Sequence, residues 1–291
     1  MNYKKTYGPA EGYTPLCEIG KCSLKNLEFG IIELGYDGHQ VFETGEREVA
    51  FVILGGSACF TANGKDYGKL GVRTNVFANP KAECFYAGRR TKVEIRSEFK
   101  VKIAVCATPI DVDTEPQAIR QADVRISRLG VKPWERDTSF IVDGTTHAKK
   151  LTIGEAYVTP GNWAGFPPHK HDVDNMPAEC VAEEIYYFLF DPQQGFGVQC
   201  LYTSDGSVDE AYRVKNDELV EFPFGYHTTV SAPGYNTYFL WLMAGDHQGF
   251  CRTNDPQHAW VSAVENLIKK SLNSLGLLHI IVHSPSPFAA P

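Results

Sequence analysis

Short apolar runs separated by Gly and Pro recur along almost the whole chain. The runs are rich in Val, Ile, Phe, Tyr and Thr, which favour strands, and the turn residues recur between them at regular spacing. This pattern is typical of an all-β sandwich or barrel. The clearest predicted strands lie within residues 48–56, 92–108, 183–190, 195–203 and 235–245.

One segment near the C-terminus follows a different period. Apolar positions recur there at helical spacing, with Asp255 ahead as the N-cap, Pro256 in the first turn and Gly276 just past the end. We therefore predict one helix over residues 256–275, packed on the outside of a barrel. The last residues, 277–291, show no clear pattern and are expected to form a non-catalytic tail.

The two halves of the chain look like distant copies of each other. The runs at 48–56 and 183–190 both begin with Glu, and each is followed by a further β segment and a Pro/Gly turn. Internal similarity of this kind indicates a duplicated β-barrel. We expect an N-terminal barrel over residues 1–130, a C-terminal barrel with its helix over 131–276, and a tail over 277–291.

Composition narrows the function classes. The chain has 291 residues and a formal net charge of −7, so it can bury a core without staples and lacks the basic balance of a nucleic-acid-binding protein. It has no apolar run of membrane-spanning length and no secretory signal at its start. Its eight cysteines include no C-x-x-C pair, which favours reduced thiols. We expect a cytoplasmic protein with no nucleic-acid or membrane partner.

The most distinctive feature is a pair of histidines two residues apart, His169 and His171. Alternate residues of a strand share one face, so both imidazoles point into the same cavity if this segment is extended. The prolines directly upstream, Pro167 and Pro168, favour an extended chain.

A carboxylate and a third imidazole complete the candidate site. Glu184 begins an alternating aromatic set and is preferred to its neighbour Glu183, while His227 follows a Pro/Gly turn and begins a strand. Together with His169 and His171 they suit one divalent ion such as Zn, Mn, Fe, Co or Ni. Four protein ligands leave positions open for substrate, so we predict a catalytic metal site rather than a closed structural one.

These motifs carry a family resemblance. H-x-H, then Glu at the head of a strand, then P-x-G-x-H is similar to the two signature motifs of the cupin superfamily. The run from PPHKHD to NDPQHAW resembles the 5-deoxy-glucuronate isomerases of inositol catabolism, and GYDGHQVFETGEREVAFVILGGSACF resembles them more loosely. The resemblance implies a duplicated cupin (bicupin). The first barrel has Glu48 at the matching strand start but neither histidine motif, so we expect no metal there.

The resemblance also implies an activity. It is the aldose–ketose isomerisation of a deoxy-uronate, most simply 5-deoxy-glucuronate to 5-dehydro-2-deoxy-gluconate in myo-inositol catabolism. The metal would chelate the C1 carbonyl and C2 hydroxyl, and a base would move a proton between C2 and C1. The candidate proton-transfer residues are Glu184, Tyr186 and Tyr226, and the sequence does not choose among them.

A sugar-acid substrate also needs binding residues. Arg213 and Arg252 are the candidates for its carboxylate, because Arg binds carboxylates with two parallel hydrogen bonds. Gln199 lies in the middle of a predicted strand and is a candidate hydroxyl partner, and His258 lies in the first turn of the predicted helix. We expect the protein to work as a homo-oligomer on this small molecule.

Three positions depart from the family pattern. Phe224 and Cys200 stand where an arginine is usual, and Trp241 stands where an asparagine is usual. These departures concern the substrate more than the metal. Two alternatives therefore stay open: a metal-dependent cupin dioxygenase, since a His-rich site can also activate oxygen, and a non-catalytic sugar-acid-binding cupin.

Overall fold

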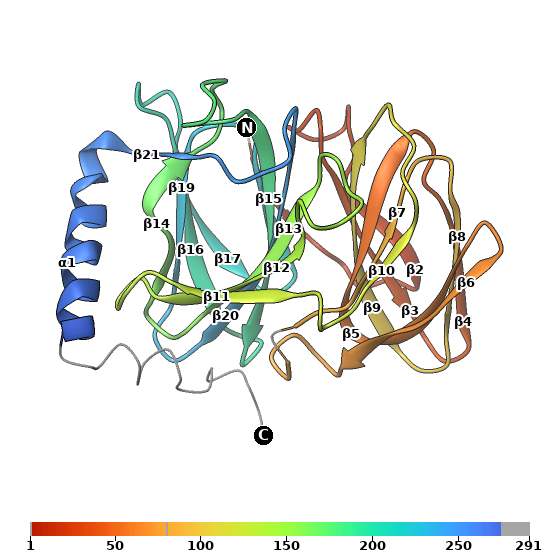
Figure 1. Ribbon diagram of the computed structural model, residues 1–291. Helices are drawn as coiled ribbons and strands as arrows, with labels where there is room; N and C mark the ends of the chain where they lie inside the picture. The colour runs from red at the N-terminus through yellow and green to blue at the C-terminus, as the bar shows by residue number, and fades with distance from the viewer. Residues whose placement is uncertain (1, 80, 275–291) are drawn as a thin grey trace.

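The computed structural model describes residues 2–79 and 81–274, which form two β-structures side by side with a helix at one end (Figure 1). The all-β prediction is confirmed. None of the described helices is long and apolar enough to cross a bilayer. The predicted tail over 277–291, and Gly276 at the expected end of the helix, lie outside the described residues.

The first half forms a nine-stranded sheet that folds over its own apolar core. Its central order is β10-β7-β5-β9-β3-β2, and the long β5 also pairs with β6 and β8, which brings in β4. The strands are β2 (Gly12–Cys17), β3 (Glu28–Leu34), β4 (Gly38–Glu43), β5 (Arg47–Ala62), β6 (Lys65–Arg73), β7 (Cys84–Ala87), β8 (Lys92–Ser97), β9 (Val101–Pro109) and β10 (Gln117–Ile119). The core cluster inside these strands consists of apolar side chains, including Phe51, Phe60 and Phe85.

The second half is a sandwich of a seven-stranded and a five-stranded sheet. The larger sheet contains β1 (Lys4–Thr6), β11 (Arg125–Leu129), β12 (Arg136–Val142), β13 (Thr152–Val158), β15 (Ala182–Asp191), β18 (Glu218–Phe222) and β20 (Asn236–Gly245). The smaller sheet contains β14 (Trp163–Lys170), β16 (Phe196–Tyr202), β17 (Asp209–Lys215), β19 (Tyr226–Ser231) and β21 (Thr253–Asn254). Although β1 and β11 precede residue 130, they pair with β18 and β12, so both belong to the second sheet system.

Strand alternation explains how one sheet serves two cores. On β15, Ile185 and Tyr187 belong to the apolar cluster that both halves share, whereas Tyr186 and Phe188 belong to the cluster inside the second half. Successive side chains of a strand point to opposite faces, so each residue of β15 has one of these two environments.

The predicted helix is confirmed, with a short 3₁₀ turn η1 (Pro256–His258) before α1 (Trp260–Ser274). Asp255 caps the start, since its Oδ1 accepts the backbone N–H of Gln257 at 2.9 Å. The helix lies outside the second half, beside β14 (Figure 1). It is tied to the body through Trp134, whose Nε1 donates to Glu265 at 2.9 Å.

Each half has a glutamate near the start of a strand whose carboxylate contacts a loop of the other half. Glu48 on β5 is fully buried and accepts backbone N–H groups from the loop before β13. The donors are Lys149, Lys150 and Leu151, at 2.7–2.8 Å. The carboxylate thereby satisfies three backbone donors of a loop that lies outside the strand ladders.

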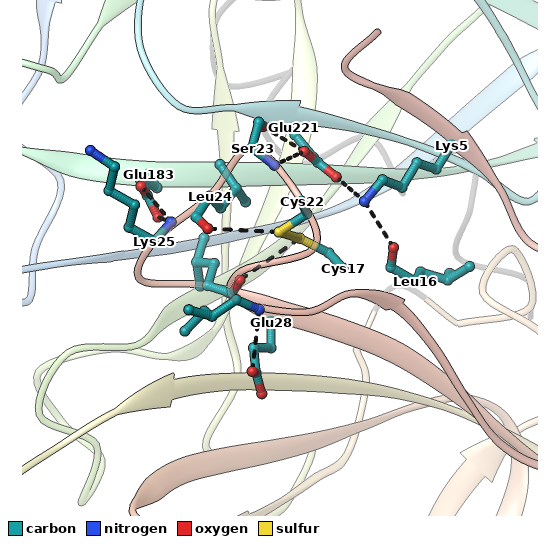
Figure 2. The surroundings of a disulfide bond; sticks show 12 residues. Lys5, Leu16, Cys17, Cys22, Ser23, Leu24, Lys25, Glu28, Glu183 and Glu221 are labelled. Atoms are coloured by element: carbon teal, nitrogen blue, oxygen red, sulfur yellow. Dashed lines mark hydrogen bonds and ion pairs between the residues drawn. A yellow bond between two sulfur atoms is a disulfide. The ribbon is translucent and has the colours of Figure 1, made fainter. Parts of the chain in front are cut away.

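Glu183 makes the equivalent contact in the opposite direction. Its carboxylate accepts the backbone N–H groups of Lys25 and Asn26, at 2.9 and 2.6 Å, in the loop before β3 (Figure 2). Glu48 therefore corresponds to Glu183 and not to Glu184. The position that matches Glu184 in the first half is Val49, which is buried in the apolar core.

The loop before β3 also contains a disulfide between Cys17 and Cys22 (Figure 2). The prediction of reduced cysteines is wrong for this pair. The chain turns back at Glu18, whose carbonyl accepts the N–H of Cys22 at 3.1 Å, and this turn brings the two cysteines together. The Ser23 N–H donates to Glu221 of β18 at 2.9 Å, so the loop is held against the second half on both sides of its turn.

A buried ion pair crosses the same boundary. Arg73 of β6 donates to Glu155 of β13 at 2.5 Å, and both side chains are almost completely buried. Glu155 also accepts hydrogen bonds from Tyr238 at 2.8 Å and Ser139 at 3.2 Å. A buried pair of this kind is stable only when the remaining lone pairs are satisfied, as they are here.

Candidate metal centre

Three strands of the second half bring the predicted ligands together. His169 lies on β14 directly opposite His227 on β19, and His171 follows the end of β14. Glu184 lies on β15, in the other sheet. The site is therefore enclosed between the two sheets, and all four side chains are buried.

Glu184 is the centre of the cluster. Its Oε2 lies 3.0 Å from Nε2 of His171 and 3.0 Å from Nε2 of His227. One ligand atom of each of these three residues lies within 4.8 Å of the other two. The His169 ring is adjacent, with its centroid 4.5 Å from that of His227, and its Nε2 lies 3.2 Å from Nη1 of Arg252.

The three imidazoles are oriented in the same way. Each places Nδ1 within hydrogen-bond distance of a backbone carbonyl; Nε2 of His171 and of His227 then faces Glu184, and Nε2 of His169 faces the Arg252 guanidinium. The pairs are His169 with Gly165 at 3.1 Å, His171 with Ala182 at 2.7 Å, and His227 with Gly225 at 3.2 Å. When Nδ1 donates to a carbonyl, the lone pair is on Nε2, which is the usual arrangement of metal-binding histidines.

One buried nitrogen of the cluster lacks a hydrogen-bond partner. Nε2 of His227 is buried and has no hydrogen bond within the described residues, although the Glu184 oxygen is 3.0 Å away. Two acceptor atoms that face each other at this distance need a proton or a cation between them. Three nitrogens and a carboxylate fit a borderline divalent ion.

The local electrostatics favour neutral imidazoles at His169 and His227 beside an ionised carboxylate, whereas at His171 the hydrogen bond with Glu184 outweighs burial and raises the pKa. Burial lowers the pKa of His169 and of His227, and the nearby Arg252 charge lowers that of His169 further. Burial alone would raise the pKa of Glu184, but hydrogen bonds with His171 and His227 outweigh it and lower this pKa. The protonation states of His169, His227 and Glu184 are those that a metal ion requires of its ligands, and His171 would release its proton when an ion binds.

A cavity of about 170 Å³ adjoins the cluster and is lined by Glu184 and His169. Most of its remaining wall is apolar, with Phe140, Phe239 and Trp241 among the side chains. Ligand pockets for drug-sized molecules have about 300–1,000 Å³. This cavity therefore suits a small metabolite.

The sequence analysis missed one charged residue of this cavity, Arg136. Arg136, Thr138 and Phe140 alternate along β12 and face the cavity, while Asp137 faces away and pairs with Arg128 at 2.8 Å. Burial and the charge of Arg252 lower the pKa of Arg136 to about 10. The alternation R-x-T-x-F was visible in the sequence, but this segment was not recognised as a strand.

Of the predicted substrate and proton-transfer residues, Tyr186 and Arg252 line the cavity. Burial, and the nearby charge of Glu184, raise the pKa of Tyr186 well above its usual range. Gln199 is buried inside the same half but does not line the cavity, and its Nε2 donates to the carbonyls of Cys200 and Thr228, both at 2.9 Å.

The described lining of the cavity does not include the other three predicted residues. Arg213 lies on the exposed face of β17, where its guanidinium covers the Phe196 ring at 4.7 Å. Tyr226 packs against Tyr202 with ring centroids 5.5 Å apart. His258 lies in η1. These residues are not brought together with the cluster.

A larger cleft of about 880 Å³ lies between the two halves. Lys102, one of its cations, is paired with Asp217 at 2.6 Å and with Glu33 at 3.4 Å. Its described lining contains no histidine, so the smaller cavity is the better candidate for a reaction site.

Comparison with known proteins identifies relatives over most of the chain. A model of the KduI/IolB family matches residues 4–261. The 5-deoxy-glucuronate isomerase of Bacillus licheniformis is 33% identical over 255 residues, which cover 87% of this chain and 94% of that protein. The enzyme of the same name from Bacillus subtilis strain 168 is 33% identical over 239 residues, or 82% of this chain and 88% of that protein.

Solved structures show the same architecture. An IolB-like protein from Salmonella typhimurium superposes with a TM-score of 0.86 at 28% identity, over 90% of this chain and 100% of that one. Oxalate decarboxylase from Lactobacillus farciminis, at 10% identity and a TM-score of 0.63 over 87% of this chain and 88% of that one, shares the fold alone. The predicted duplicated cupin is confirmed, and the chain belongs to the KduI/IolB family.

Proposed function

We propose that this protein is a metal-dependent aldose–ketose isomerase that converts 5-deoxy-glucuronate to 5-dehydro-2-deoxy-gluconate in inositol catabolism. Relatives of that name that are about one-third identical along most of the chain support the reaction. The observation that carries the proposal is the juxtaposition of His171, Glu184 and His227 with a small cavity that also exposes two guanidinium groups. This arrangement can bind a small anionic sugar at both ends.

We propose His169, His171, Glu184 and His227 as the residues that hold the ion. The orphaned Nε2 of His227 and the common orientation of the rings support this assignment. When bound, a divalent ion supplies Lewis acidity to the carbonyl and hydroxyl oxygens of the open-chain sugar. Its identity among Zn, Mn, Fe, Co and Ni is for metal analysis to determine.

The chain itself would carry the proton. Glu184 Oε2 faces the histidines, while its other oxygen, Oε1, has no hydrogen bond or ion pair to another described residue. We assign the transfer of the proton from C2 to C1 to this oxygen. Tyr186 stays protonated at neutral pH because its pKa is raised by burial, so its hydroxyl can donate a hydrogen bond to a substrate oxygen. Tyr226, outside the described cavity lining, is a weaker candidate.

The two halves would have different tasks. We propose that residues 131–276 form the catalytic unit and that residues 1–130 form a barrel without metal, apart from β1 and β11, which pair with β18 and β12. The apolar interior of the first half supports this division. A cytoplasmic homo-oligomer is the expected form of the enzyme, and light scattering on the purified protein tests the oligomer.

The direct test is an assay of metal-replete protein on a panel of uronic acids, with ketose formation as the readout. We expect turnover of 5-deoxy-glucuronate, with solvent deuterium entering the carbon that was C1 of the substrate, which is C6 of the product, if a protein group carries the proton. Binding without turnover on every acid would contradict the isomerase proposal and favour a sugar-acid-binding protein.

A further inference from the structure

We propose that Arg136 is the residue that binds the substrate carboxylate, with Arg252 beside it, and that it makes the site selective for a sugar acid over a neutral sugar. The identity of the sugar rests on the proposed function. The charge preference does not, because it follows from the two guanidinium groups in the cavity.

The first argument is the lack of a protein counter-ion. Arg136 is 8% exposed and has no ion pair or side-chain hydrogen bond to another described residue. Arg252 contacts His169 and the Phe250 ring, and likewise has no carboxylate partner within the described residues. Two like charges in a small, mostly apolar cavity are costly unless an anion compensates them.

The neighbouring carboxylates are already engaged. Glu265 on α1 accepts hydrogen bonds from Trp134 at 2.9 Å and Lys269 at 2.6 Å. Glu184 is held by the histidines. The unpaired positive charge of the cavity is therefore available to a ligand.

The second argument is the order of groups along the cavity. Arg252 Nη1 lies 3.2 Å from Nε2 of His169 and so lies at the metal end, whereas Arg136 makes no hydrogen bond or ion pair with the four proposed ligands within the described residues. An open-chain uronate has its aldehyde at C1 and its carboxylate at C6. With C1 and C2 at the metal, the carboxylate lies at the Arg136 end, and apolar side chains such as Phe140 and Trp241 suit a C5 that carries no hydroxyl.

The test compares Arg136→Met with Arg136→Lys and with a control, Arg96→Met, on the exposed face of β8 in the first half. Each metal-replete protein is assayed on 5-deoxy-glucuronate and on 5-deoxy-glucose, which replaces the carboxylate with a neutral alcohol. Calorimetry with the C1-reduced forms of both sugars, which cannot isomerise, measures binding separately from turnover. Metal content and melting temperature report whether each variant is folded.

We expect Arg136→Met to weaken binding of the reduced acid and lower kcat/KM for the acid by about 100-fold, the effect of one lost charge-assisted pair. Binding of the neutral sugar should change by less than about 3-fold, since hydrogen bonds to an uncharged hydroxyl carry less free energy. Arg136→Lys should recover part of the loss because it keeps the charge but not the planar fork. Arg96→Met should match the wild type.

Equal binding of the acid by wild type and a folded Arg136→Met would overturn the inference, as would a wild type that does not prefer the acid. If Arg136→Met does not fold, Arg136→Lys decides on the same criteria. If the wild type shows no turnover yet binds the reduced acid through Arg136, the proposed reaction fails while the carboxylate site stands.

Discussion

Two adjacent glutamates on β15 provide a stringent test of the site, because they face opposite sides of one strand. Glu183 accepts backbone N–H groups of Lys25 and Asn26, and Glu184 contacts His171 and His227. We expect Glu183→Gln to lower stability and keep the metal, and Glu184→Gln to lose the metal and keep the fold. Both substitutions remove one charge and preserve side-chain size.

The expected loss at Glu183 follows from its contacts. Hydrogen bonds to a charged group contribute about 1.5–3 kcal/mol each, and Gln retains one acceptor oxygen for the two N–H groups. We expect the free energy of unfolding to fall by about 2–3 kcal/mol. At about 2–4 °C per kcal/mol for a large domain, the melting temperature should fall by about 5–10 °C.

The expected loss at Glu184 concerns the metal. The amide of Gln is a poor ligand for a borderline cation, and the cluster loses its only negative charge within the described residues. Wild-type protein should gain about 2.7 kcal/mol of stability when the metal is present at 100 times its Kd. Glu184→Gln should show almost none of this gain.

The assay is metal content by mass spectrometry after dialysis, together with urea unfolding with and without added metal. Stoichiometric metal in Glu184→Gln, or its loss from Glu183→Gln in protein that is still folded, would refute the assignment of the two faces. The same metal content and the same stability in both variants would also contradict the placement of the two side chains on opposite faces of β15.

Three further predictions concern stability and metal dependence. Reduction of the Cys17–Cys22 disulfide should lower the free energy of unfolding by about 2 kcal/mol without loss of metal, as measured by denaturation with and without reductant, because the bridge closes a short loop outside the metal cluster. Arg73→Met should cost about 3–5 kcal/mol in the same measurement, since it leaves Glu155 buried without its counter-ion; a loss below about 1 kcal/mol would contradict this account. Chelation with EDTA should abolish isomerase turnover, and addition of a divalent ion should restore it, whereas full activity after verified metal removal would refute metal dependence.

The sequence was sufficient for the features that depend on local spacing. The period-two patterns predicted the strands, and the N-cap Asp255 followed by Pro256 predicted the start of the helix. The H-x-H pair and the later Glu and His predicted the cluster, because each lies at a strand position whose facing follows from alternation. The choice of Glu184 over Glu183 agrees with their observed contacts.

Features that depend on pairing between distant segments were not predictable in this way. Arg213 and Arg136 both lie on strands, where alternate side chains point to opposite faces. Arg213 faces solvent on β17, whereas Arg136 faces the cavity from β12. Facing depends on which side of the strand meets the other sheet, and that is fixed only by tertiary packing. The Cys17–Cys22 contact likewise depends on the turn at Glu18.

The comparison of the two halves explains why only one carries the site. Glu48 and Glu183 share a structural task, so the difference lies at the next residue, Val49 or Glu184, whose side chain points into the barrel. A carboxylate at Val49 alone would be buried among apolar side chains without an imidazole partner, and an uncompensated buried charge is strongly destabilising. The metal cluster is therefore stable only when its imidazoles and its carboxylate are all present. The histidine of the first half, His39, is exposed, so a carboxylate at Val49 would have no buried imidazole there, and the packing favours a purely structural barrel.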